Sequence, residues 1–344
     1  MSASNKKIGV LLINLGTPDS TSVGDVRRYL REFLMDRRVI DVPFIQRFPL
    51  VCGIIAPFRA PESAKIYREV WQERGSPLKF YGEDLVQKLQ TALGDNYHVG
   101  FAMRYKNPNL RDVVKNFENK GFSKIIAIPM YPQYASSSTG STIEYLMEHV
   151  RRWEVLPSME IVGQFFNNPD FIQCIVENAK PMMEKETYDH FVFSYHGIPE
   201  RHIKKSSCDG YCQITDKCCG TWHDKNRYCY RAQCFATTRL LTEALNIPQD
   251  KHTVCFQSRL GKDPWIQPYA EDTLINLAKS GKKKVLAFSP AFVTDCLETT
   301  IEVGEEYKEL FLENGGEQWD LVQSLNANDS WVDCLKNMVE KSSH

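Results

Sequence analysis

Two short apolar runs in the sequence each end in groups that can bind a metal ion or move a proton. The first run, His190–Tyr195, is followed directly by His196. The second, Lys284–Ser289, precedes a series of acids, Asp295, Glu298, Glu302 and Glu306. Each run has the length of a buried parallel strand, and open α/β sheets bind ligands beyond the carboxyl ends of their strands. We therefore expect the imidazole and the carboxylates to face one crevice, where they can bind a divalent cation, accept protons, or both.

The acidic series has helical spacing. Glu298, Glu302 and Glu306 recur every four residues, which places three carboxylates about 6 Å apart along one stripe of a helix. A solvated acidic face is the commoner cause of such a stripe. Here Asp295 and the strand just upstream start the stripe at the expected crevice, which favours a function.

Strand-length apolar runs alternate with amphipathic helical patterns along the whole chain. The expected strands are Ile8–Leu15, His98–Arg104, Lys124–Pro129, Met159–Phe165, Phe191–Tyr195, Thr253–Ser258 and Lys284–Ser289. The expected helices are Ser63–Gln72, Glu83–Ala92, Leu110–Lys120, Thr142–Trp153, Asp170–Glu184, Cys234–Leu245 and Tyr269–Ser280. This alternation predicts an α/β fold in which helices cover both faces of parallel sheets.

Length and composition suggest two domains and exclude some functions. A chain of 344 residues exceeds the usual size of one core, and the pattern starts afresh near Asn168. We therefore expect two α/β domains, 1–167 and 168–325, with a cleft between them. The 42 basic and 43 acidic residues lack the basic excess of a nucleic-acid-binding protein. The longest apolar run, Ile8–Leu15, is too short to span a membrane, and no signal-peptide cleavage pattern follows it, so we expect a cytoplasmic protein.

One apolar segment breaks the alternation. Residues Val42–Phe58 include three prolines and cannot form one regular helix. A buried connection is the favoured interpretation. The alternative is an apolar lip that meets a flat hydrophobic ligand or a membrane surface.

Seven short motifs, in order and covering nearly the whole chain, resemble those of the ferrochelatases, which insert ferrous iron into a porphyrin to make haem. They are Val10–Pro18, Arg74–Leu78, Met103–Tyr105, Tyr131–Ser141, Ser194–Pro199, Phe256–Trp265 and Thr294–Thr299. The resemblance implies two Rossmann-like, chelatase-type domains around a porphyrin cleft. It also implies a carboxy-terminal helix within 326–344 that packs back on the first domain.

The resemblance assigns roles to single residues. His196 matches the active-site imidazole of the family. An imidazole is largely neutral near pH 7, and this form can accept pyrrole protons and bind iron. Glu298 is its best-supported partner, with Asp295 and Glu302 in the same ridge of acids. The residues that the resemblance implies for the porphyrin are Trp265, Tyr134, Ser136 and Arg104, with Arg259 as a second candidate for a propionate. A packing anchor is the alternative for the tryptophan, and a surface ion pair for either arginine.

A cysteine-rich insert, 206–234, follows the His196 strand and holds six of the eleven cysteines. Disulfides are not expected in a reducing compartment. Some ferrochelatases hold a 2Fe–2S cluster in such an insert, and Cys212, Cys219, Cys229 and Cys234 are the expected ligands, with Cys218 and Cys208 as alternates. A structural zinc ion is the alternative, because four thiolates bind either group.

Several alternatives stay open in the sequence. Protoporphyrin IX is favoured over coproporphyrin III as the substrate. A haem or metal carrier without turnover is the competing function. Monomer and homodimer both fit, and residues 44–58 are a candidate for peripheral contact with the inner membrane.

Overall fold

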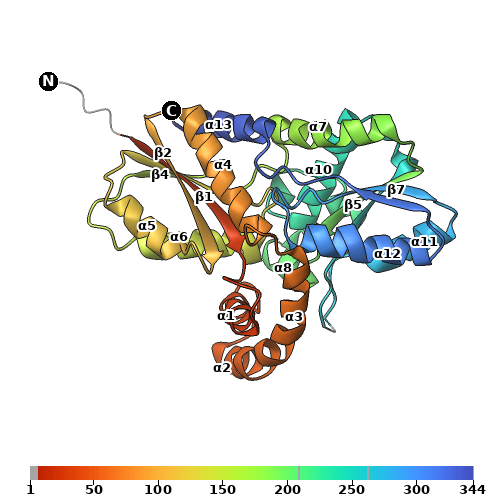
Figure 1. The fold of residues 1–344 in the computed structure, drawn as a ribbon, viewed down its shortest axis with the longest axis horizontal. Helices are drawn as coiled ribbons and strands as arrows, with labels where there is room; N and C mark the ends of the chain where they lie inside the picture. The colour runs from red at the N-terminus through yellow and green to blue at the C-terminus, as the bar shows by residue number, and fades with distance from the viewer. Residues whose placement is uncertain (1–6, 208–209, 262, 344) are drawn as a thin grey trace. The chain divides into compact units, whose positions relative to one another are not determined.

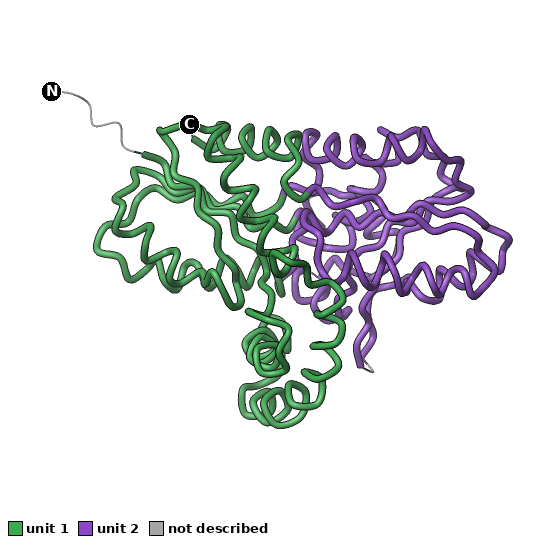
Figure 2. Tube along the Cα trace, viewed as in Figure 1, with its two compact units in different colours: residues 1–131, 136–164, 326–344 green, residues 132–135, 165–325 purple. Residues whose placement is uncertain are grey.

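The computed structural model describes residues 7–207, 210–261 and 263–343, which form two compact units. Unit 1 comprises residues 1–131, 136–164 and 326–344, and unit 2 comprises residues 132–135 and 165–325 (Figure 2). The sequence-based boundary at 167/168 lies three residues beyond the point where the main part of unit 2 begins. Cys208, an alternate cluster ligand, lies outside the described residues.

Unit 1 contains a four-stranded parallel sheet in the order β2-β1-β3-β4. Its strands are β1 (Ile8–Gly16), β2 (Tyr97–Tyr105), β3 (Lys124–Pro129) and β4 (Ser158–Ile161). The central strand β1 pairs with β2 on one side and with β3 on the other. Seven of the nine β1 residues are buried, as expected for a parallel strand that is covered on both faces.

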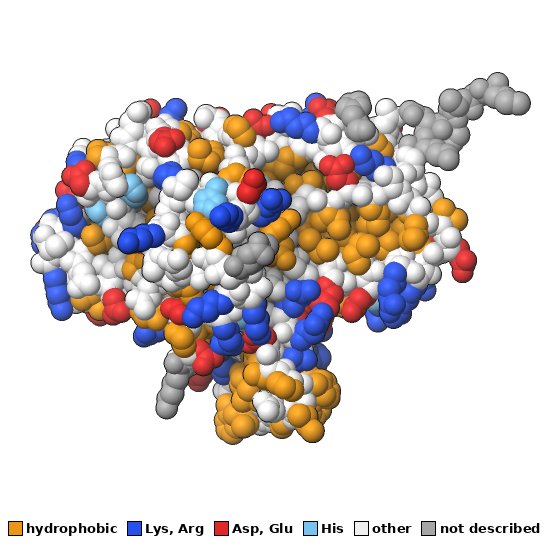
Figure 3. Space-filling view, turned by 180° about the vertical axis from the view of Figure 1, so that it is seen from behind, with side chains coloured by type: hydrophobic (Ala, Val, Ile, Leu, Met, Phe, Trp, Pro, Cys, Tyr) orange, Lys and Arg blue, Asp and Glu red, His pale blue; other side chains and the backbone are white. Residues whose placement is uncertain are grey.

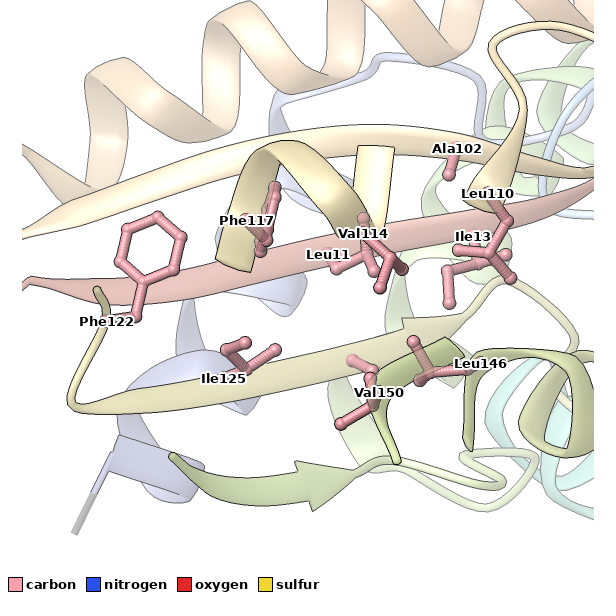
Figure 4. Close-up of a cluster of buried hydrophobic side chains, with 11 residues drawn as sticks. Leu11, Ile13, Ala102, Leu110, Val114, Phe117, Phe122, Ile125, Leu146 and Val150 are labelled. Carbon is pink, nitrogen blue, oxygen red and sulfur yellow. The ribbon is translucent and has the colours of Figure 1, made fainter. Parts of the chain in front are cut away.

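Helices cover both faces of this sheet (Figure 1). On one face, α5 (Leu110–Glu118) and α6 (Ser141–Val150) pack on the strands through a core that includes Leu11, Phe117 and Ile125 (Figure 4). On the other face, α4 (Pro77–Leu93) contacts β1 and β2. The carboxy-terminal helix α13 (Asp329–Ser343) packs against α4 and β3, so the end of the chain belongs to unit 1.

A helical arm extends from unit 1 between β1 and α4. It consists of α1 (Val23–Leu34), α2 (Phe44–Phe48), the π-helix η1 (Pro49–Ile55) and α3 (Ala56–Val70). The sequence-based expectation that this segment is not one regular helix is confirmed. The favoured interpretation of a buried connection is wrong, because large apolar side chains at the end of the arm are exposed. They are Phe44, Ile45, Phe48, Leu50, Ile54 and Phe58.

Unit 2 contains a second four-stranded parallel sheet, in the order β6-β5-β7-β8. Its strands are β5 (His190–His196), β6 (His252–Gln257), β7 (Lys284–Phe288) and β8 (Gln318–Leu321). Helices α11 (Ala270–Lys279) and α12 (Tyr307–Glu313) share one apolar core with β5, β6, β7 and β8. Helices α7 (Pro169–Lys185) and α10 (Tyr230–Ala244) pack on each other.

The predicted fold class is confirmed, since both units are parallel sheets flanked by helices. All seven expected strands exist, although β4 ends four residues before the expected end at Phe165. Strand β8 was missed, because its four residues, Gln-Trp-Asp-Leu, are too few to show a periodic pattern. Within the described ranges, no helix combines the length and the apolar character needed to cross a bilayer.

A buried ion pair joins the helical arm to the sheet of unit 1. Asp36, which follows α1, accepts hydrogen bonds from Arg104 Nη2 at 2.6 Å and from the hydroxyl of Tyr105 at 2.9 Å. It also accepts one from Ser141 at the start of α6. Burial by itself raises the pKa of Asp36, but the bond from Ser141, the backbone N–H of Arg38 and the charge of Arg104 more than offset this. The pKa of Asp36 therefore lies below its usual value.

We predict that Asp36→Asn destabilises the protein by about 3 kcal/mol, because it leaves the charge of Arg104 buried without its partner. Because the pKa of Asp36 is lower in the folded state than in the unfolded state, its ionisation stabilises the fold. This contribution is complete above the unfolded-state pKa of about 3.9 and is lost as the pH falls through the folded-state pKa. The free energies of unfolding of wild type and variant, measured with urea, should therefore show the full difference at pH 7 and a smaller difference below about pH 4.

The exposed pair Arg74–Asp84 provides the control for this experiment. Asp84→Asn should cost under about 1 kcal/mol, because solvent screens an exposed pair. Equal losses for the two aspartates would contradict a special role for Asp36.

Candidate functional site

His196 is the last residue of β5, and its side chain is half-buried. Its Nδ1 lies 2.6 Å from the carbonyl oxygen of Gly197. A carbonyl oxygen only accepts hydrogen bonds, so Nδ1 must carry the proton. In the neutral ring, Nε2 then keeps its lone pair and can accept a proton or bind a metal ion.

The next residue, Gly197, allows a close approach of two chain segments. Its backbone N–H donates to the carbonyl oxygen of Gln257 at 2.8 Å. A Cβ at position 197 would lie 2.7 Å from that same oxygen and 3.2 Å from the ring of Trp265. Any side chain larger than hydrogen would therefore displace the backbone that supports the imidazole.

Trp265 is held against the loop that follows His196. Trp265 pairs with Pro199 in an isolated bridge, and the amide of Ile266 donates to the carbonyl of Ile198 at 3.1 Å. The structure therefore brings together His196 and Trp265, which are 69 residues apart in sequence. The indole is half-buried and lies against Gly197, the residue that follows the imidazole, so part of its flat apolar surface is exposed there.

The acidic residues after β7 form a π-helix, η6 (Glu298–Glu306). The amide of Tyr307 accordingly bonds to the carbonyl of Glu302, five residues earlier. The regular α-helical stripe expected from the sequence is thus replaced by a wider turn, of a kind that is frequent at functional sites. Glu298 and Glu302 are half-buried whereas Glu306 is exposed, so the series runs from the interior to solvent.

Glu302 has three hydrogen-bond donors. They are Gln257 Nε2 at 2.9 Å, the Ser258 hydroxyl at 2.6 Å and the Tyr307 hydroxyl at 3.2 Å. Burial, followed by the charge of Glu302, raises the pKa of Tyr307, so the phenol stays protonated and remains a donor. These bonds fix the orientation of the Glu302 carboxylate.

Gln257 connects this carboxylate to the histidine strand. Its Oε1 accepts from the Ser194 hydroxyl at 2.8 Å, while its Nε2 also approaches the carbonyl of Glu298 at 3.3 Å. Sequence reasoning did not assign Gln257 a role. The available signal was an amide at the end of a strand that pairs with the histidine strand.

The remaining acids lie on the same segment. Asp295 Oδ1 accepts from the backbone N–H of Ser324 at 3.3 Å. Burial raises the pKa of the Cys296 thiol, and the neighbouring carboxylate of Glu298 adds to this effect. Asp295, Glu298, Glu302, His196 and Trp265 are therefore all positioned by unit 2, at the carboxyl ends of β5, β6 and β7.

The other predicted porphyrin contacts are divided between the units. Tyr134 belongs to unit 2, where its amide donates to Gln233 Oε1 at 2.7 Å. Ser136 belongs to unit 1 and accepts a hydrogen bond from Arg38 Nη1 at 2.8 Å. Arg104, also in unit 1, is paired with Asp36, and its guanidinium lies over the ring of Tyr145 at 4.2 Å.

Four cysteines of the insert form a group that we call the thiol nest: Cys212, Cys218, Cys219 and Cys229. The Sγ atoms of Cys218 and Cys219 are 3.5 Å apart, and hydrogen bonds connect Cys212 to Cys218 and Cys219 to Cys229. The bond from Cys219 lowers the pKa of Cys229, whereas the same bond and burial raise that of Cys219. A small cavity beside Tyr211 and Asn226 is lined by three of these thiols.

Backbone and cationic donors point at the sulfurs of the thiol nest. The amide of Gln213 donates to Cys218 Sγ at 3.4 Å, and those of Ile214 and Ala232 interact with Cys212 and Cys229. Arg231, which is buried, contacts Cys219 and pairs with Asp216 at 2.9 Å. Such donors stabilise thiolate ligands.

Cys234, one of the four expected cluster ligands, lies in the second turn of α10. Its thiol is fully buried and hydrogen-bonded to Tyr230, whereas Cys218 takes a place in the nest. Every cysteine in the described part of the chain is a free thiol. Within the described residues as a whole, no group of three or more His, Cys, Asp or Glu side chains is arranged to hold a single metal ion.

Comparisons with known proteins show the family of this chain. The sequence profile of the ferrochelatase family matches residues 7–343. A ferrochelatase of Legionella pneumophila (strain Philadelphia 1) is 43% identical over 333 residues, which cover 97% of this chain and 98% of the relative. One from Coxiella burnetii (strain Dugway 5J108-111) is 42% identical over 340 residues, 98% and 95% of the two chains.

Among solved structures, SirB from Bacillus subtilis with Fe3+ shares the fold at 10% identity. The TM-score is 0.52, and the match covers 98% of this chain and 95% of SirB. The two parallel sheets are therefore a chelatase-like fold. On the family match and the identities of its relatives, the chain belongs to the ferrochelatases, lyases that act with ferrous iron in haem biosynthesis.

Proposed function

We propose that His196 accepts the pyrrole protons of a bound porphyrin, and that Glu298, Asp295 and Glu302 carry charge between the imidazole and solvent. The observation that carries this assignment is the bond from His196 Nδ1 to Gly197, which leaves Nε2 as the basic atom. Metallation needs a bent porphyrin, the loss of two protons and a dehydrated ferrous ion. A neutral imidazole serves the second need and can take part in the third.

The acids suit a stepwise path. Glu302 is fixed by three donors, Glu298 lies one turn closer to the strand end, and Glu306 is exposed. Protons leaving through this series and ferrous iron entering through it are both compatible with its charge. In this proposal Trp265 and Tyr134 provide apolar and aromatic contacts to the macrocycle, and Ser136 provides a hydroxyl.

Protoporphyrin IX is the porphyrin that we propose as substrate. It carries two vinyl groups where coproporphyrin III carries two further propionates, and the half-buried indole of Trp265 suits the more apolar ring. Of the two candidate arginines, Arg259 is the better propionate partner. Its guanidinium is exposed over the ring of Tyr269 at 4.3 Å, whereas that of Arg104 is already paired.

We predict that His196→Ala lowers kcat for insertion of ferrous iron or zinc by at least about 100-fold, while porphyrin still binds. Glu298→Gln should lower kcat about tenfold. Insertion into protoporphyrin IX and coproporphyrin III is followed by the loss of porphyrin fluorescence or by the gain of zinc-porphyrin fluorescence. Glu305→Gln is the matched control, because this exposed acid lies on the same π-helix.

A His196→Ala variant that retains wild-type turnover would exclude the imidazole as the base. Wild-type protein that binds porphyrin without inserting metal would instead indicate a haem or metal carrier. Faster turnover of coproporphyrin III would overturn the proposed substrate.

For the insert, we propose that the thiol nest holds a 2Fe–2S cluster, with Cys212, Cys218, Cys219 and Cys229 as ligands. The support is the chemistry of the donor set: four thiols with backbone amides and one buried arginine directed at them. Cys229 also precedes the first turn of α10, where the helix dipole stabilises a thiolate. When bound, such a cluster cross-links the insert and can respond to oxidants.

We predict that Cys229→Ser abolishes visible iron–sulfur absorption of the purified protein, because a hydroxyl is a poor replacement for a thiolate ligand. Cys234→Ser should keep the absorption, and the distant Cys174→Ser serves as a control. Iron, sulfide and zinc are quantified in each variant. If the protein holds one equivalent of zinc and shows no iron absorption, the insert binds a structural zinc ion instead of a cluster. If Cys234→Ser loses the absorption, Cys234 is a ligand, as expected from the sequence.

The exposed apolar end of the helical arm supports a third proposal, peripheral contact of a cytoplasmic enzyme with the inner membrane. Phe44, Ile45 and Phe58 are 63%, 80% and 76% exposed. Figure 3 shows hydrophobic side chains covering this end of the arm. Apolar side chains gathered on a helical projection bind the boundary between lipid headgroups and acyl chains.

We predict that Ile45→Ser combined with Phe58→Ser weakens binding to phosphatidylcholine vesicles about tenfold or more, since each change removes about 2 kcal/mol of transfer energy. Vesicle sedimentation measures the binding. Leu312→Ser, at a less exposed apolar residue of unit 2, is the control. If the double variant binds vesicles as wild type does but dissociates a dimer in light scattering, the arm is a contact between copies of the chain.

A further inference from the structure

Both polar groups of the peptide that joins His196 to Gly197 are hydrogen-bonded. The Gly197 N–H donates to the carbonyl of Gln257 at 2.8 Å, which continues the pairing of β5 with β6. The carbonyl of His196 accepts from the hydroxyl of Tyr230 at 2.9 Å. This peptide plane is therefore held from both sides, one bond coming from the sheet and the other from α10.

The orientation of the imidazole depends on this peptide. His196 Nδ1 bonds to the carbonyl of Gly197 in the next peptide, so a turn of the His196–Gly197 peptide shifts Gly197 and with it the carbonyl that selects the tautomer. Gly197 has little room to move, since Gln257 and Trp265 lie close to the position that a Cβ would take there. A loss of the bond from Tyr230 would free one side of the peptide plane and leave a carbonyl without that partner.

Tyr230 is well suited to hold this position. Its side chain is only 6% exposed, and burial raises the pKa of the phenol far above its usual value, so the hydroxyl remains a donor. The same oxygen interacts with the thiol of Cys234 one turn later in α10. Tyr230 also follows Cys229 directly, so the residue that bonds to the His196 backbone is adjacent to the thiol nest.

From these contacts we propose that Tyr230 is a positioning residue for metal insertion. It fixes the His196–Gly197 peptide and thereby keeps the proton on Nδ1 and the lone pair on Nε2. The proposal rests on the proposed role of His196 as the proton acceptor. Tyr230 itself touches neither substrate nor metal in this assignment.

The test is Tyr230→Phe, which removes one oxygen and keeps the ring. We expect kcat for zinc insertion into protoporphyrin IX to fall about fivefold with KM for the porphyrin unchanged, as for the loss of one buried hydrogen bond. The 15N resonances of His196, assigned by their absence from His196→Ala, should show a smaller share of the Nδ1–H tautomer.

Tyr195→Phe is the matched control. Tyr195 is likewise a buried tyrosine of unit 2, and its hydroxyl bonds to Thr238 Oγ1 at 2.8 Å rather than to the histidine backbone. It should lose comparable thermal stability and keep wild-type kcat and His196 resonances. A merely structural role of Tyr230 would give the two variants the same kinetics.

Three outcomes separate the possibilities. An unchanged kcat and an unchanged His196 spectrum in Tyr230→Phe would overturn the proposal while His196→Ala, if inactive, still supported the role of His196. Equal losses of kcat in both tyrosine variants would also overturn it. If Tyr230→Phe fails to fold, 3-fluorotyrosine in place of tyrosine tests the same bond. The fluorine changes the acidity of the donor hydroxyl, which should shift the His196 resonances. An absence of any shift would count against the proposal.

Discussion

The peptide bond between His196 and Gly197 is the constraint on which the candidate site depends. Its N–H extends the pairing of β5 with β6, its carbonyl is bound by Tyr230, and the next carbonyl receives the imidazole N–H. Parallel pairing fixes where β5 ends, and the lack of a side chain at Gly197 lets Gln257 and Trp265 come close. These contacts fix the backbone that orients the His196 imidazole, as its proposed role requires.

The acidic segment is tied to the same strand ends by side chains rather than by the sheet. Gln257 receives a hydrogen bond from Ser194 and donates to Glu302, so one amide connects β5, β6 and η6. The π-helical turn of η6 lets half-buried acids follow each other while Glu306 remains in solvent. A carboxylate held by three donors resists reorganisation, which suits the proposed role of Glu302 in moving charge.

The insert contributes contacts to the end of β5 as well as the thiol nest. It begins soon after His196 and ends in α10, whose first residues serve two neighbours: Cys229 belongs to the thiol nest, and Tyr230 binds the histidine backbone. Arg231 continues the series by contacting Cys219. Three consecutive residues therefore connect the cysteines with the end of β5.

The sequence by itself determined the α/β class, the strand ends that bear His196 and the acids, and the family. A buried parallel strand shows as a continuous apolar run, and its end here shows as a Gly or Pro that follows. Both features lie within a short stretch of sequence, so the sequence alone predicts them. Only the tertiary structure decided the partners. Arg104 is paired with Asp36, and Cys218 lies beside Cys219 in the thiol nest. Six large apolar side chains of residues 44–58 are exposed, Gln257 bonds to Glu302, and Tyr230 bonds to the His196 carbonyl. These contacts join residues that are distant in the chain. The periodicity of a segment predicts its secondary structure and its buried face but not the side chain that it will contact.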